Sequence, residues 1–174
     1  HTWSTFDTPP VTELVSLPTH TVARTLAANT ELAAKAKAVL TPGEFFQVTI
    51  ADGSTLDGWM LKPRDFDPSK RYPMLMYVYG EPAGQTATDS WGAIDTWHLM
   101  LTQMGYAVIT LDNRGTPSLR GRAWRKSVYR KIGVYASEDQ AGAARAIGRW
   151  SWVDSTRFGI WGWSGGGSMT LNLM

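Results

Sequence analysis

A glycine-flanked serine near residue 164 restricts the possible folds of this 174-residue chain more than any other feature. The segment Gly162 to Gly166 reads GWSGG and matches G-x-S-x-G, a pattern in which a serine lies in a sharp turn between a strand and a helix. Residues 157–161 have strand composition. Such a turn strains its backbone by about 1–3 kcal/mol, and side chains at 162 and 166 would clash. The pattern predicts Ser164 as a nucleophile, with Gly162 and Gly166 forming the elbow around it.

The glycine run allows two other interpretations. In the first, the run is an ordinary glycine-rich turn whose serine caps a helix, because G-x-S-x-G also occurs by chance. In the second, the glycines cradle a phosphate. This second interpretation fails because no Lys-Ser or Lys-Thr pair follows them and the G-x-G-x-x-G register is not met.

Charge and composition exclude several other classes of protein. The 17 basic and 15 acidic side chains nearly cancel, and no block of like charges suggests nucleic acid as a partner. The densest basic stretch, 120–131, is interleaved with aromatic residues and is expected to be a solvated helix or loop face. No apolar run approaches the ~20 residues that span a bilayer. With no Cys, neither disulfides nor thiolate metal sites form. The sequence gives no support for a metal or organic cofactor.

The first part of the chain has the sequence pattern of an all-β region. Short strands are expected at 2–6, 11–17 and 21–26, with prolines between them. An Ala- and Lys-rich segment at 30–40 favours a helix, which ends where Pro42 and Gly43 follow. We therefore place a domain boundary between residues 42 and 43.

From residue 43 onward the pattern becomes α/β. It begins with a hairpin, and two continuous apolar runs then indicate strands that are covered on both faces. Alternation of strand, helix and strand implies a mostly parallel sheet with right-handed crossovers. The expected segments are the hairpin strands 46–50 and 56–61, interior strands 74–79 and 106–111, helices 97–104 and 137–150, and the strand 158–161.

A serine nucleophile needs a base and an orienting acid, which in this fold class follow the serine along the chain. His1, His20 and His98 all precede Ser164, and residues 165–174 contain no Asp or Glu. We expect the acid and the histidine of the triad to lie outside this chain, so that the chain alone would be inactive and would expose apolar sheet edges. His98, in an apolar helical segment, is expected to be a packed residue.

Four motifs together resemble the dipeptidyl peptidase IV branch of the prolyl oligopeptidase family of serine peptidases. They are YVYGEP at 77–82, LDNRG at 111–115, SEDQ at 137–140 and IWGWS at 160–164. The resemblance spans nearly the whole chain. It implies that residues 1–42 are the last strands of a β-propeller with its linker, and that residues 43–174 are the first half of an α/β-hydrolase domain.

The resemblance also implies roles for individual residues. The nucleophile corresponds to Ser164, and the oxyanion hole to the N–H of Gly165 and the hydroxyl of Tyr79. Tyr79 ends a predicted parallel strand, where open α/β sheets place their ligand groups. The sequence departs from the family at residue 165, because the aromatic that normally follows the nucleophile is a glycine here. In the family, that aromatic helps to wall the pocket for the residue before the scissile bond, so the resemblance does not extend to the family's preference for proline.

Four charged residues in these motifs receive no catalytic step. Asp112 and Arg114 are expected to brace a loop. Glu138 and Asp139 are interpreted as carboxylates in the first turn of a helix, where the helix dipole favours them.

The leading functional hypothesis is a serine peptidase that removes dipeptides from the N-termini of peptide substrates through an acyl-enzyme. Fold and nucleophile do not choose between amide and ester, so an esterase or acyl-hydrolase of the same fold remains an alternative. A non-catalytic binding protein with a propeller and a hydrolase domain is the other. The resemblance further implies a possible homodimer and, for bacterial members, a periplasmic or secreted location.

Overall fold

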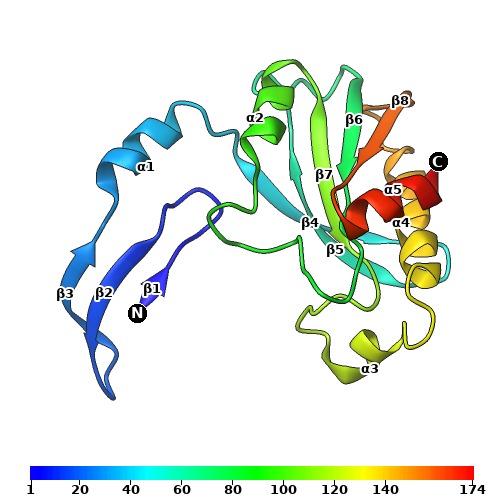
Figure 1. Cartoon of the computed structure of the whole chain (residues 1–174). Helices are drawn as coiled ribbons and strands as arrows, with labels where there is room; N and C mark the ends of the chain where they lie inside the picture. The colour runs from blue at the N-terminus through cyan, green and yellow to red at the C-terminus, as the bar shows by residue number, and fades with distance from the viewer.

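The computed structural model describes residues 1–174, and its first part is a small antiparallel sheet that stands apart from the rest of the chain (Figure 1). Its strands pair in the order β1-β2-β3, and β3 leads into the helix α1. These elements match the expected strands and helix of this region to within a few residues. The bounds are β1 Thr2–Trp3, β2 Val11–Ser16, β3 Thr21–Ala27 and α1 Thr30–Lys37.

The remaining strands form one mixed sheet in the order β4-β5-β7-β6-β8. The hairpin strands β4 and β5 pair antiparallel with each other, and β5 pairs antiparallel with β7. The strands β7, β6 and β8 are mutually parallel, as expected from their apolar composition and the helices between them. The bounds are β4 Gly43–Thr49, β5 Thr55–Leu61, β6 Tyr72–Tyr77, β7 Ala107–Asp112 and β8 Val153–Trp161.

Helices cover both faces of this sheet, and each face has its own core. Alternation along β7 decides which side chain faces which helix: Val108 joins the core that contains Leu99 and Leu101 of α2, while Ile109 joins the larger core with Ile147 of α4. The arrangement is that of an α/β-hydrolase domain. The bounds are α2 Thr96–Gln103, α3 Gly121–Lys126, α4 Val134–Ile147 and α5 Gly165–Leu173.

Helix α4 begins three residues earlier than the sequence pattern indicated. Gly133 is its N-cap and adopts φ 87°, a left-handed conformation that glycine tolerates without strain. The expected first-turn placement of Glu138 and Asp139 is therefore wrong, because the first turn of α4 contains no acidic residue. Asp139 instead lies further along the helix and is buried.

A few contacts attach the N-terminal sheet to the larger one. The ring of Phe6 packs edge-on against Trp59 of β5, with ring centroids 5.6 Å apart. The backbone N–H of Phe6 donates to the carboxylate of Asp89 at 2.7 Å. The assignment of residues 1–42 to a propeller and its linker stays a prediction. Among the helices of the chain, none combines the length and the apolar character needed to cross a bilayer.

Candidate active site

Ser164 occupies the bend between β8 and α5. β8 ends at Trp161, and α5 begins at Gly165 with Ser164 as its N-cap residue. The serine has φ 56° and ψ −119°, a strained conformation for a residue with a Cβ. Its side chain is exposed and makes no capping hydrogen bond to the helix. The hydroxyl is thus presented to solvent at a tight strand-to-helix turn instead of satisfying the helix end.

The glycines at 162 and 166 face the same backbone group. A Cβ on either residue would overlap the carbonyl oxygen of Val78, which follows β6. A Cβ on Gly162 would also lie 2.6 Å from the carbonyl carbon of Gly166. The N–H of Val78 donates to the carbonyl of Trp161 at 3.0 Å, which brings the ends of β6 and β8 together. The bend therefore closes only because both positions lack side chains.

Gly165 lies buried at the first position of α5. A first-turn N–H has no partner within its own helix and lies at the positive end of the helix dipole. The next two N–H groups bond back into the turn: Gly166 donates to the carbonyl of Trp163 at 2.8 Å, and Gly167 to that of Ser164 at 2.9 Å. The N–H of Gly165 is thus available to an oxyanion that forms beside Ser164.

Tyr79 lies two residues beyond the end of β6, which stops at Tyr77 and not at residue 79 as the sequence indicated. Its Cα is 3.2 Å from the position of a Cβ built on Gly166, so its backbone abuts the bend. The ring lies against Gly84 and is half-buried. No side-chain or backbone group of the chain forms a hydrogen bond with its hydroxyl, which leaves that O–H free to donate to a substrate. The role of Tyr79 in the oxyanion hole stays a prediction.

A buried amide network holds the loop that contains Tyr79. The Nδ2 of Asn113 donates to the carbonyl oxygen of Gly80 at 3.1 Å, and the Nε2 of Gln140 donates to the Oδ1 of Asn113 at 3.0 Å. Gln140 also donates to the carbonyl of Leu111 at 2.8 Å. Sequence reasoning noted the motifs that contain Asn113 and Gln140 but did not find this link. The only signal was their position, with Asn113 directly after β7 and Gln140 within α4.

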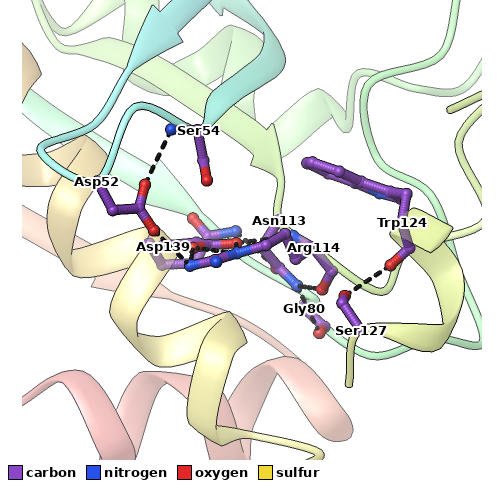
Figure 2. Close-up of polar contacts among 9 residues, drawn as sticks. Asp52, Ser54, Gly80, Asn113, Arg114, Trp124, Ser127 and Asp139 are labelled. Carbon is purple, nitrogen blue, oxygen red and sulfur yellow. Dashed lines mark hydrogen bonds and ion pairs between the residues drawn. The ribbon is translucent and has the colours of Figure 1, made fainter. Parts of the chain in front are cut away.

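Next to this network lies a buried ion pair (Figure 2). The Nε of Arg114 contacts both carboxylate oxygens of Asp139 at 3.0 Å, and the backbone N–H of Arg114 donates to the same carboxylate at 2.8 Å. A guanidinium nitrogen of Arg114 also reaches the more exposed Asp52 at 2.9 Å. These hydrogen bonds to Asp139 raise the pKa of Arg114. The pair therefore anchors α4 to the loop after β7.

Asp112 braces a loop, as predicted for a strand-end carboxylate. It accepts hydrogen bonds from the N–H of Thr86 at 2.8 Å and from that of Ala87 at 3.3 Å. Burial raises the pKa of its carboxyl above the ordinary value. Because its oxygens are occupied by the loop at 85–87, we assign it no catalytic step.

His98 is a packed residue, as expected. Its ring lies among Trp59, Tyr77 and Trp161, with centroid distances of 5.7, 5.2 and 5.4 Å. Burial lowers its pKa to about 4. A neutral, enclosed imidazole of this kind is not placed to serve Ser164 as a base. His1 and His20 belong to the separate N-terminal sheet region.

Comparisons with known proteins agree with this architecture. A model of the prolyl oligopeptidase family matches residues 93–174. The crystal structure of Porphyromonas gingivalis dipeptidyl peptidase 4 matches with a TM-score of 0.94 and 41% identity. The match covers 99% of this chain and 24% of the Porphyromonas chain. A second crystal structure, of a putative dipeptidyl aminopeptidase IV from Bacteroides ovatus, matches with a TM-score of 0.87 and 32% identity, over 99% of this chain and 24% of that one.

The curated relatives of this chain are also named as dipeptidyl peptidases or dipeptidyl-aminopeptidases. A probable dipeptidyl-aminopeptidase B of Uncinocarpus reesii is 40% identical over 150 residues, which are 86% of this chain and 16% of the relative. A probable dipeptidyl peptidase 4 of Aspergillus flavus is 33% identical over 168 residues, which are 95% of this chain and 22% of the relative. The chain thus spans less than a quarter of the length of these proteins.

A mixed sheet with helices on both faces and a strained serine between β8 and α5 defines the α/β-hydrolase class. Within that class, the chain belongs to the dipeptidyl peptidase IV branch of the prolyl oligopeptidase family.

Proposed function

We propose that the full-length protein is a serine dipeptidyl peptidase, in which Ser164 attacks the carbonyl carbon of the second peptide bond of its substrate. The backbone of Ser164 carries this proposal, because φ 56° with ψ −119° lies outside the left-handed helical region that a residue such as Asn29 adopts, and is maintained only where the surrounding structure enforces it. Here the enforcement comes from two glycines pressed against the carbonyl of Val78. The names of the similar proteins support a peptidase over an esterase or a non-catalytic protein.

In the proposed reaction, the Ser164 oxygen bonds to the acyl carbon and its proton passes to a general base. None of the three histidines of this chain is placed for that role, so the base is a residue supplied by the rest of the full-length protein. The tetrahedral oxyanion accepts hydrogen bonds from the Gly165 N–H and the Tyr79 hydroxyl. Collapse of the intermediate breaks the C–N bond, and the leaving amine takes the proton. Water then hydrolyses the acyl-enzyme and releases the dipeptide.

The test uses the full-length protein and its Ser164→Ala variant. We expect the variant to fold normally but to lose both turnover of dipeptidyl amides and covalent labelling by a serine-directed fluorophosphonate. Turnover that survives this substitution would refute the proposal. A panel that compares dipeptidyl amides with short-chain esters separates a peptidase from an esterase.

The matched variant Tyr79→Phe removes only the proposed oxyanion donor. Loss of one such donor typically reduces kcat by about 10²–10³-fold, with a smaller effect on KM, because the donor acts mainly on the transition state. An unchanged kcat would exclude Tyr79 from the oxyanion hole while leaving Ser164 as the nucleophile.

A further inference from the structure

The side chain of Glu81 fills the space over the residue that follows the proposed nucleophile. A Cβ built on Gly165 would overlap the carboxyl group of Glu81 and would lie 2.7 Å from its Cγ. The backbone of Gly165 does not have the left-handed φ that excludes side chains, whereas Gly80 and Gly133 do. What keeps residue 165 small is thus a neighbouring side chain, not the conformation of the bend.

Hydrogen bonds hold the backbone at Glu81. It follows Gly80, whose carbonyl accepts the hydrogen bond from Asn113, and its own carbonyl accepts one from the N–H of Gly84 at 3.4 Å. The loop that carries Tyr79 therefore also fixes the backbone from which the Glu81 side chain extends toward Gly165.

The carboxylate of Glu81 has no partner within the chain. The side chain forms no hydrogen bond, and none of the salt bridges includes it, although the residue is partly buried. Other carboxylates of the chain with comparable burial are paired; Asp57, for example, binds Arg120 at 2.8 Å. An unpaired carboxylate beside a nucleophile is a site for a cation.

The geometry of acyl transfer decides which part of a substrate meets this carboxylate. For attack, the acyl carbon must approach within about 3–3.5 Å of the Ser164 oxygen, with its own oxygen directed at the N–H of Gly165. The side chain of the acyl residue branches from the Cα that is bonded to that carbon. With the carbonyl oxygen held at the Gly165 N–H, that side chain starts beside Gly165, within reach of the Glu81 carboxyl group that lies over it.

We propose that Glu81 is a specificity-determining residue of this site and that it selects lysine or arginine at the residue before the scissile bond. This inference rests on the proposed peptidase function. A carboxylate beside a forming oxyanion opposes it by like-charge repulsion, and a cationic substrate side chain cancels that repulsion. A neutral side chain leaves it uncompensated. The selection is therefore expressed in the transition state and appears in kcat/KM.

The experiment compares two dipeptidyl amides that share the first residue and carry either lysine or the neutral isostere norleucine as the second. The full-length protein should cleave the lysine substrate with a kcat/KM about tenfold higher, as for a charge-assisted contact. Glu81→Gln should reduce this ratio about tenfold. Asp65→Asn, which changes the net charge equally at an exposed site, should leave the ratio unchanged. The ratio is used because a partly misfolded variant lowers both rates together.

Gly165→Ala provides a second variant, since its new methyl group displaces the carboxylate of Glu81 without removing it. It should lower the lysine-to-norleucine ratio in the same direction as Glu81→Gln. High salt should also reduce the ratio of the unmodified protein, because it screens the charge interaction.

The possible outcomes distinguish the role of Glu81 from the proposed peptidase function on which it rests. If the unmodified protein cleaves both substrates equally, or if Glu81→Gln preserves the lysine preference, the role of Glu81 is overturned and the peptidase assignment stands. If Glu81→Gln slows both substrates equally while the variant stays folded, the carboxylate holds the substrate's α-amino group, and the inference is again overturned. Absence of turnover on both substrates overturns both.

Discussion

The side-chain amide of Asn113 donates a hydrogen bond to the carbonyl oxygen of Gly80 at 3.1 Å and so ties the loop after β7 to the loop after β6. Gln140 of α4 fixes the orientation of this amide by donating to its Oδ1 at 3.0 Å. Both Tyr79 and Glu81 flank Gly80. A buried polar contact thus positions the two side chains that the proposed mechanism and the proposed specificity require.

Asn113 is therefore expected to act as a positioning residue. Asn113→Ala should lower kcat of the full-length protein about tenfold or more with a smaller change in KM, because a misplaced donor weakens the transition state. Asn113→Asp retains an oxygen for Gln140 but loses the donor to Gly80, so it should be impaired similarly. Steady-state kinetics well below the melting temperature provide the measurement. A purely structural residue would lower the melting temperature and leave kcat unchanged there.

The elbow glycines differ in their tolerance of a methyl group. Gly166→Ala should destabilise the protein by at least about 2 kcal/mol, because its Cβ would overlap a backbone carbonyl that no rotamer change can move aside. Gly167→Ala is the matched control: its Cβ would lie 3.5 Å from the nearest atom, the carbonyl oxygen of Gly162. It should be neutral or stabilise the helix by up to about 1 kcal/mol. Denaturant unfolding measures both, and equal effects would contradict the packing described.

The two acidic partners of Arg114 should contribute unequally to stability. Asp139 is fully buried and Asp52 is 47% exposed. Asp139 accepts hydrogen bonds from both the backbone N–H and the guanidinium of Arg114 away from water, so Asp139→Asn should cost about 3 kcal/mol. Asp52→Asn removes an exposed partner and should cost less than about 1 kcal/mol. The free energies of unfolding of the two variants test this directly, and similar values for both would show that burial does not govern the network.

His98 should make the stability depend on pH. Its pKa is lowered from 6.5 to about 4 in the folded protein by burial, so below pH 6.5 the unfolded chain binds a proton that the folded chain does not. Stability should thus be complete above pH 6.5 and fall by about 2–4 kcal/mol as the pH approaches 4.

His98→Phe keeps the ring within its aromatic surroundings and should remove most of this dependence. The comparison is needed because the raised pKa of Asp112 acts in the opposite direction over part of the same range. Thermal unfolding of both proteins at pH 7 and pH 4.5 provides the measurement. An equal drop in the two proteins would assign the dependence to other groups.

Most of the secondary structure could be predicted because it rests on local patterns. The apolar runs around 74–79 and 106–111 gave interior strands, and the prolines and glycines gave the turns between them. The start of α4 could not be predicted, because Gly133 supplies a left-handed cap where the sequence lacks a side-chain capping signal. When the start of a helix depends on backbone conformation, the residue types around it do not reveal where the helix begins.

The sequence by itself determined the bend at Ser164, because a strand, a serine between glycines and a helix are consecutive and their strain is local. Only the tertiary structure decided that Glu81 lies over Gly165 and that Asn113 holds Gly80. Those contacts join segments that are far apart in the chain and meet at one edge of the sheet. Their existence depends on strand order and side-chain volume, which a linear pattern does not specify.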